Sequence, residues 1–237
     1  MYDFAYPYDN EEELLEEYYK NGIKNVVLCY KVNKKDDLKI FERKNIIVFK
    51  KINVFKCAIV ESEDINNIIK LSTDLFYSEK YYNDFVFIKT SKHLKNILNK
   101  YYYNGLLNPI GKITYKYFFK DLDYSDLNKI KRNNLSVLFS LKESIKDKMY
   151  SIIYFNKIAQ KKGIDILLGS FAQKKEEVPT KIELYSLRKV FGIKYSLKYQ
   201  NKIFYKQLKR TRLAKRKDYF RKGYYIVKYP YEDCSEY

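Results

Sequence analysis

The sequence predicts an α/β protein: a TIM-like β/α barrel in a single domain, followed by a basic C-terminal tail. Short apolar runs alternate with helical patterns along most of the chain. These runs are nearly continuous, which is typical of parallel strands that helices cover. Seven to eight such runs precede residue 192, and that number is enough to close a small barrel. A doubly wound open sheet fits nearly as well, because periodicity alone does not set the order of the strands.

The expected strands are rich in Val, Ile, Leu and Phe, and they span residues 2–6, 25–30, 45–50, 56–62, 84–89, 115–119, 135–141 and 164–170. The expected helices cover residues 10–22, 65–76, 90–105, 124–134, 142–162 and 180–192. Asn10 and Asp64 are expected N-caps, and Gly22 is expected to end the first helix. Thr180 and Glu183 form a capping-box pattern at the start of the last helix.

The domain organisation is simple, because no Pro/Gly/Ser-rich linker divides the chain. We expect residues 1–193 to form the barrel. Residues 194–237 then form a basic extension that packs on the barrel or projects from it. Within this extension, residues 223–231 have the pattern of a short edge strand.

The charge balance points to an anionic partner. The chain has 47 Lys and Arg against 29 Asp and Glu, for a formal net charge of +18. Such a charge repels itself in the folded state unless something anionic shares the surface, and nucleic acid is the usual partner. A membrane is the rival, but no apolar run approaches the roughly 18 residues that a spanning helix needs. The acidic N-terminus is unlike a signal or transit peptide, so we expect a cytoplasmic protein.

The basic residues are concentrated in the stretch KQLKRTRLAKRKDYFRK, residues 206–222, in which nine of seventeen residues are Lys or Arg. Abundant lysine can follow from the codon bias of an AT-rich genome, but clustered arginine cannot. The chain has seven arginines and four lie in this stretch, where a planar guanidinium would suit phosphate. The RNA-binding residues predicted here are Lys209, Arg210, Arg212, Lys215, Arg216, Lys217, Arg221 and Lys222. Neighbouring aromatics could stack on unpaired bases or pack the tail onto the barrel.

Catalytic and metal chemistry is poorly supported. His93 is the only histidine, and Cys29, Cys57 and Cys234 are too far apart for a structural zinc site. Cys29 and Cys57 lie in apolar runs and are expected to be buried and inert. The polar residues expected at strand ends, where a β/α barrel places its chemistry, are Asp3, Tyr6, Glu61, Glu63, Lys89, Ser140 and Ser170. No phosphate-binding glycine motif or nucleophile elbow accompanies them, so we predict no catalytic residue and no metal ligand.

The order of several segments resembles one known family. They are Phe139-Ser140, Ile145-Lys146-Asp147, Leu168-Gly169-Ser170-Phe171-Ala172 and Leu187-Arg188-Lys189-Val190-Phe191-Gly192-Ile193, together with residues 82–100. This series is similar to ribonuclease P protein component 3, the archaeal and eukaryotic barrel subunit, across about residues 1–193. Where that family has arginine, this chain has Lys120 in the mid-chain segment and Lys181 before the last helix. Both lysines keep a positive charge and are added to the predicted RNA-binding residues.

The resemblance implies a barrel without catalysis or a cofactor of its own. It implies a ribonucleoprotein whose RNA, with Mg²⁺ bound by that RNA, removes the 5′ leader of precursor tRNA. The implied partners are ribonuclease P RNA, precursor tRNA indirectly, and the RRM-like protein component 2, with a heterotetramer as one arrangement. Two alternatives stay open: a metal-dependent phosphoesterase of the PHP barrel type, and a general basic RNA- or ribosome-associated protein.

Overall fold

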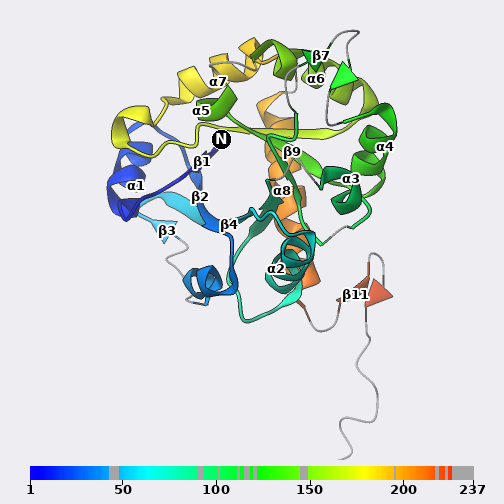
Figure 1. Ribbon diagram of the computed structural model, residues 1–237. Coiled ribbons are helices and arrows are strands. Elements are labelled where there is room, and N and C mark those ends of the chain that lie inside the picture. Colours follow the sequence, from blue (N-terminus) through cyan, green and yellow to red (C-terminus); the bar gives the residue numbers. More distant parts are fainter. Residues whose placement is uncertain are drawn as a thin grey trace, which may run out of the picture.

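Seven parallel strands form a nearly closed barrel with helices around it (Figure 1). The computed structural model describes residues 1–42, 48–89, 93–100, 102–110, 113–114, 118–119, 122–144, 149–194, 196–216, 219–221 and 224–225. In order around the barrel, the strands are β1 (Tyr2–Ala5), β2 (Asn25–Val32), β4 (Ile52–Val60), β5 (Phe85–Ile88), β6 (Gly105–Leu107), β9 (Ser136–Ser140) and β10 (Asp165–Gly169). The strands follow one another in chain order, which confirms a barrel over a doubly wound sheet.

The barrel closes between its last and first strands through a few contacts rather than a full ladder. Ala5 and Ala172 form an isolated parallel bridge. The amide of Tyr6 donates to the carbonyl of Ala172 at 2.8 Å, and the amide of Phe171 donates to the carbonyl of Phe4 at 2.7 Å. The seam is therefore hydrogen-bonded near the ends of these strands.

The helices lie outside the ring of strands (Figure 1). They are α1 (Glu11–Lys20), α2 (Ile65–Tyr77), α3 (Leu94–Ile97), α4 (Tyr124–Arg132), α5 (Leu141–Ser144), α6 (Met149–Lys162) and α7 (Lys181–Val190), with 3₁₀ turns η1 (Lys35–Phe41) and η2 (Lys175–Glu177). Asp64 and the Thr180–Glu183 capping box start their helices as predicted. Asn10 does not cap α1, because its side chain bonds elsewhere. No helix in the described ranges is long and apolar enough to cross a membrane.

Two of the predicted barrel strands were wrong, because the strands found there lie outside the ring of parallel strands. The run at residues 45–50 contributes β3 (Val48–Phe49), which pairs antiparallel with β4 and is not a barrel strand. Of the run at 115–119, the described residues form β8 (Phe118–Phe119), which pairs antiparallel with β7 (Ile113–Thr114) outside the barrel sheet. The strand in its place is β6, which begins at Gly105. A Cβ on Gly105 would lie 2.0 Å from the carbonyl oxygen of Ser136, so only glycine allows β6 to approach β9 this closely.

The barrel interior is filled by large apolar side chains from alternate positions of the strands. Phe4, Phe85 and Phe87 contact one another with ring centroids 6.1–6.4 Å apart. Cys29 and Cys57 face the same interior as register partners on β2 and β4, so the prediction that both are buried is confirmed. Burial raises the pKa of the Cys29 thiol, which keeps it protonated and weakly reactive.

Helix α8 (Leu197–Ala214), within the predicted basic extension, completes this interior. It crosses the middle of the ring of strands in Figure 1, and it adds Ile203, Phe204 and Leu208 to the interior core. The Phe204 ring stacks on Tyr2 with centroids 4.8 Å apart, and it contacts Phe55 at 5.3 Å and Phe85 at 5.1 Å. The start of the extension therefore packs on the barrel.

Replacing Phe204 by alanine should destabilise the protein by about 3–5 kcal/mol, because it removes a fully buried ring and leaves a cavity in the barrel. Urea denaturation followed by circular dichroism measures the change. Tyr205→Ala is the matched control, since the Tyr205 ring is 47% exposed and its removal should cost less than about 1 kcal/mol. Equal destabilisation of the two variants would contradict the placement of α8.

Candidate nucleic-acid interface

The polar side chains of α8 bind the residues at which barrel strands begin. Asn104, directly before β6, donates from Nδ2 to the Gln207 carbonyl at 2.9 Å and accepts at Oδ1 from the Thr211 hydroxyl at 2.9 Å. Asn134, before β9, accepts at its carbonyl from Gln207 Nε2 and Arg210 Nη1, both at 3.1 Å. The helix therefore covers the N-terminal end of the barrel, meaning the end where the strands start.

Charged residues of α8 add to these anchors. Lys206 Nζ lies 2.5 Å from Oδ2 of Asp165, the first residue of β10. Arg212 donates from Nη2 and Nε to Oδ1 of Asp84, at 2.8 and 3.1 Å, just before β5. Part of the positive charge of this helix thus holds it to the barrel.

Lys215, at the C-cap of α8, is anchored most deeply. Its Nζ donates to the carbonyls of Tyr81 and Asn83 and to Asn83 Oδ1, the latter two at 2.9 and 2.8 Å. Burial lowers the pKa of Lys215 to about 7, and the carboxylate of Asp84 opposes this shift. Lys215 therefore faces the barrel rather than solvent.

The solvent-exposed side of α8 is a basic surface, and Lys206 and Arg212, at its edges, also reach the barrel. The α8 sequence contains no acidic residue. Its exposed cations, with one that follows the helix, recur every three or four residues, and we call them the basic face: Lys198, Lys202, Lys206, Lys209, Arg212 and Arg216. Tyr199 and Tyr205 lie among these cations, and their side chains are 40% and 47% exposed. At about 1.5 Å per residue, the helix extends this surface over about 27 Å.

The predicted RNA-binding residues therefore divide into groups. Lys209, Arg212 and Arg216 are exposed on the basic face, whereas Arg210 and Lys215 are partly buried against the barrel. Lys181 is exposed at the start of α7. Lys120, Lys217 and Lys222 lie outside the described residues, and Arg221 is described only as the end of strand β11 (Tyr219–Arg221), which pairs with β12 (Tyr224–Tyr225). The expected edge strand at 223–231 is described only over β12.

Further positive charge lies where β1 begins. Burial lowers the pKa of the Met1 amino group, and Arg188, Lys181 and Lys24 lower it further. The guanidinium of Arg188 is 1% exposed, stacks 4.5 Å from the centre of the Tyr2 ring and donates to the Tyr2 carbonyl at 2.9 Å. Lys181 thus lies at the same end of the barrel as α8, a proximity that the sequence did not indicate.

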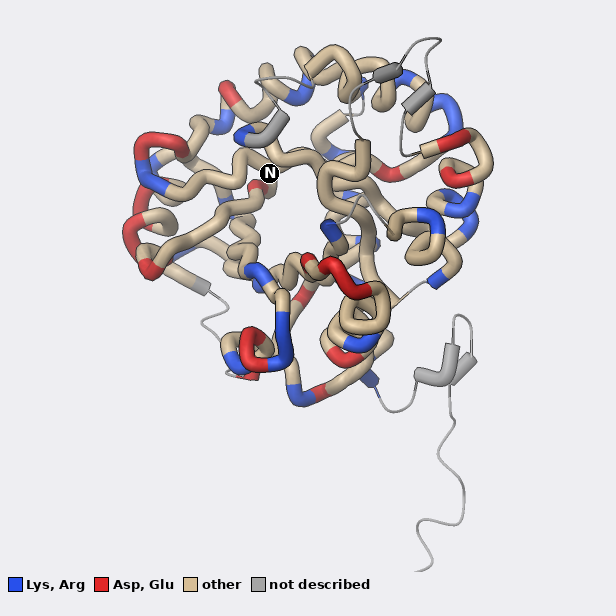
Figure 2. Tube along the Cα trace, viewed as in Figure 1, with Lys and Arg blue, Asp and Glu red and all other residues tan. Residues whose placement is uncertain are grey.

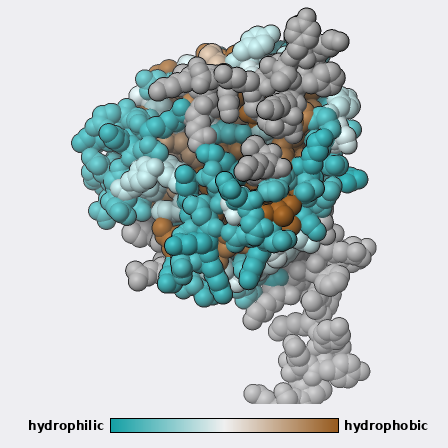
Figure 3. Space-filling view, in the orientation of Figure 1, coloured by the Kyte–Doolittle hydropathy of each residue, from teal (hydrophilic) through white to brown (hydrophobic). Residues whose placement is uncertain are grey.

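Acidic residues are spread over several elements, and the most acidic helix lies away from α8. This helix is α1, at the left edge of the molecule in Figure 2, and its first turn contains Glu11, Glu12 and Glu13. Figure 3 shows that hydrophilic residues predominate over the left and lower parts of the same view. The positive charge of the N-terminal end of the barrel is therefore not masked by the most acidic helix.

The polar residues that were expected at the C-terminal ends of the strands make contacts within the protein. The carboxylate of Asp3 is fully buried and accepts hydrogen bonds from the Tyr18 hydroxyl at 2.8 Å, the Ser170 hydroxyl at 2.5 Å and the Ser170 amide at 2.8 Å. Burial raises the pKa of Asp3, against the effect of these hydrogen bonds. Asp3 joins β1, α1 and β10 and cannot reach a substrate in this position.

The remaining strand-end residues are spread out. Glu61 lies 3.6 Å from Lys31 and 3.9 Å from Lys89, the amide of Ser140 donates to Asn108 Oδ1 at 2.9 Å, and His93 Nε2 lies 2.7 Å from the Glu63 carbonyl. Among the described residues, no group of three or more His, Cys, Asp or Glu side chains could hold a metal ion.

The fold has known counterparts. Over 96% of its length the chain is similar to 99% of a chain from the cryo-EM structure of archaeal ribonuclease P with mature tRNA, with a TM-score of 0.68 and 12% identity. It is also similar over 78% of its length to the whole of a chain assigned as the histidinol phosphatase hisK of Listeria monocytogenes, with a TM-score of 0.51 and 7% identity. In sequence, no family model and no curated protein matches the chain. At these identities the similarity establishes the β/α barrel fold.

The pKa of Lys215 makes stability depend on pH. The unfolded chain keeps this proton up to about pH 10.4, whereas the folded chain releases it near pH 7. Between pH 7 and 10 the unfolded state therefore binds more protons, so the free energy of unfolding contributed by this group rises with pH. We therefore compare the free energy of unfolding of wild type with that of Lys215→Met, measured by urea denaturation. From pH 7 to pH 9 this free energy should rise more for wild type than for the variant. A difference that is constant over this range would contradict the assignment.

Proposed function

We propose that this protein is an RNA-binding subunit of ribonuclease P, of the component 3 class. Its basic face would contact the RNA of the complex. Two independent lines support the proposal. Segments of the sequence resemble component 3 in order and spacing, and nearly the whole chain shares its fold with a chain of an archaeal ribonuclease P structure. The basic face is the observation that carries the RNA-binding part.

The basic face suits a nucleic-acid backbone in both charge and shape. Lys198, Lys202 and Lys209 are exposed on one side of a rigid helix and have no ion pair with another described residue. Lysines held in a row can each neutralise a phosphate and release its counterions. Tyr199 and Tyr205 lie among them, so an unpaired base could stack there. This surface recognises the backbone and carries little information about sequence.

In this proposal the barrel contributes binding and no chemistry of its own. The RNA would carry out the cleavage of precursor tRNA with its own Mg²⁺. Protein component 2 would be the protein partner, with a heterotetramer as one arrangement. The acidic helix α1 lies away from the basic face and would face away from the RNA.

The alternative of a PHP-type phosphoesterase has the weaker support. The fold is shared with a chain assigned as a histidinol phosphatase, but at 7% identity. Asp3, the carboxylate that this alternative needs on the first strand, is buried in hydrogen bonds at the seam. A general RNA- or ribosome-associated protein would use the same basic face, so only the identity of the bound RNA separates it from the main proposal.

Isolation of the tagged protein from its own cells, followed by sequencing of the RNA that remains after a moderate salt wash, tests the assignment. We expect one structured RNA of the ribonuclease P type, together with cleavage of precursor tRNA in the same fraction. Bulk ribosomal RNA would instead favour the general RNA-associated protein. Recovery of no RNA would contradict both.

The basic face itself is tested by the triple variant Lys198→Ala, Lys202→Ala, Lys209→Ala. Affinity for the copurified RNA should fall, and the slope of log K against log salt should become shallower by about one unit for each phosphate that is no longer neutralised. Filter binding between about 50 and 200 mM salt measures both quantities. The control carries Lys70→Ala, Lys157→Ala and Lys161→Ala, which remove the same charge from exposed positions of α2 and α6. Equal effects in the two triple variants would assign binding to net charge alone.

A further inference from the structure

A cleft lies at the other end of the barrel, where β1 and β2 finish. Its volume is about 380 Å³, within the size range of small-molecule sites. Tyrosine rings from both strand ends and the following loop line it, together with a lysine and two carboxylates of η1: Tyr6, Tyr8, Tyr30, Lys31, Asp36 and Asp37. Ligand sites of β/α barrels form at this end of the strands. The contacts that close the barrel and attach α8 do not involve these side chains.

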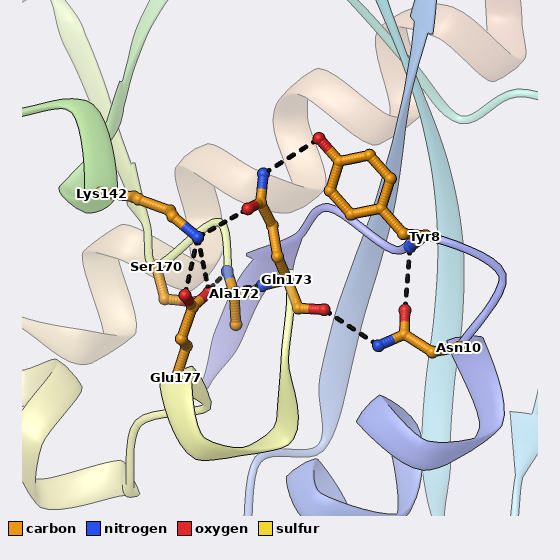
Figure 4. Close-up of polar contacts among 7 residues, drawn as sticks. All are labelled: Tyr8, Asn10, Lys142, Ser170, Ala172, Gln173 and Glu177. Carbon is orange, nitrogen blue, oxygen red and sulfur yellow. Dashed lines mark hydrogen bonds and ion pairs between the residues drawn. The ribbon is translucent and has the colours of Figure 1, made fainter.

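Tyr8 is 63% exposed, and both its backbone amide and its hydroxyl are hydrogen-bonded (Figure 4). Its amide donates to Asn10 Oδ1 at 2.8 Å, and its hydroxyl accepts from Gln173 Nε2 at 3.4 Å. Asn10 Nδ2 in turn donates to the Gln173 carbonyl at 2.9 Å. The next residue, Asp9, has φ of 53°, a left-handed conformation that disfavours most side chains.

The same network extends to Lys142 on α5, directly after β9. Lys142 Nζ lies 2.6 Å from Gln173 Oε1 and 2.7 Å from Glu177 Oε1, and the Gln173 amide donates to Glu177 Oε2 at 2.8 Å (Figure 4). Segments that follow β1, β9 and β10 are therefore joined in one hydrogen-bonded network that reaches the Tyr8 hydroxyl. A hydrogen bond at the hydroxyl reduces the side-chain freedom that the ring would lose when a flat ligand binds to it.

The other walls of the cleft limit what that flat ligand can be. Tyr6 lies with its ring centre 5.5 Å from that of Tyr8, at an interplanar angle of 59°. The Tyr6 hydroxyl is protonated at neutral pH, as for an ordinary tyrosine, and burial raises its pKa further. Lys31 supplies a partly exposed cation, and its contact with Glu61 is long, at 3.6 Å. Asp36 supplies an exposed carboxylate that can accept from hydroxyl or amino groups, since its contact with Lys39 measures 3.8 Å.

We propose that this cleft binds one nucleotide, with its base stacked on Tyr8, its phosphate near Lys31 and its sugar hydroxyls or exocyclic amino group near Asp36. A nucleotide has a flat aromatic base for Tyr8, an anionic phosphate for Lys31 and hydrogen-bond donors for Asp36. Stacking of a base on an aromatic side chain tolerates any base. The nucleotide could be free, or it could be an unpaired residue of a bound RNA. The proposal does not require the basic face or the ribonuclease P assignment.

Isothermal titration of the full chain with AMP, adenosine, ribose 5-phosphate and the single-stranded oligonucleotide A5 tests the cleft. AMP should bind. Adenosine should bind more weakly because it lacks the phosphate, and ribose 5-phosphate should not bind because it lacks the base. Tyr8→Ala should weaken AMP binding about tenfold, in line with the contribution of one stacked base, and Lys31→Ala should remove the preference for AMP over adenosine. Tyr150→Ala, which removes a ring that is 69% exposed on α6, should change nothing.

Comparison of A5 binding with AMP binding shows whether the nucleotide is free or is a residue of an RNA. Binding of A5 that is tighter than AMP and equally sensitive to Tyr8→Ala would identify an RNA residue, whereas AMP binding without A5 binding would identify a free nucleotide. The triple variant of the basic face should keep its affinity for AMP, which separates this proposal from the RNA-binding one. Absence of AMP binding, or AMP binding that Tyr8→Ala leaves unchanged, would overturn the proposal.

Discussion

The insertion of Phe204 and its neighbours on α8 into the N-terminal end of the barrel determines much of what the protein can present to a partner. The interior core is built from strand side chains, and Ile203, Phe204 and Leu208 complete it at that end. Because a helix has two sides, burial of this apolar stripe turns the lysines at positions 198, 202 and 209 outward. The same packing thus closes the core and exposes the basic face.

The polar contacts of α8 make its orientation specific. Apolar packing alone would tolerate small rotations of the helix, but Asn104 pairs with both Gln207 and Thr211, and Arg212 pairs with Asp84. Removal of the Thr211 hydroxyl would leave the fully buried Asn104 side chain with one hydrogen bond fewer, which costs about 1 kcal/mol. These anchors also neutralise part of a charge of +18 that would otherwise repel itself. Lys198, Lys202 and Lys209 remain exposed and available to an anionic partner.

The barrel itself could be predicted from the sequence because its strands are buried on both faces and therefore have continuous apolar runs. Residues 25–30 and 164–170 carry this pattern clearly and form β2 and β10. β6 could not be predicted this way, since it has three residues and starts with a glycine that only the neighbouring Ser136 explains. The run at 45–50 was misassigned because an antiparallel edge strand has the same local composition as a barrel strand.

The candidate sites were less predictable. The density of Lys and Arg at 206–222 predicts a basic extension, but the helix over Leu197–Ala214 was not among the expected elements. The same density hides the inner stripe of this helix, which includes the polar residues Gln200, Gln207 and Thr211. Clustered arginine suggested phosphate contacts, yet Arg210 and Arg212 bind groups at the strand starts that are far away in sequence. The cleft around Tyr8 gave no local signal, because Gln173 and Asn10 meet only when the barrel closes.

The two-sided role of α8 is tested most directly by amine footprinting. Lysines of the protein would be acetylated with and without the copurified RNA, and the modified peptides quantified by mass spectrometry. We predict that Lys202 and Lys209 are reactive in the free protein and become protected by RNA, while Lys157 and Lys161 on α6 stay reactive in both states. Protection of the α6 lysines, with Lys202 and Lys209 unchanged, would contradict this role of α8.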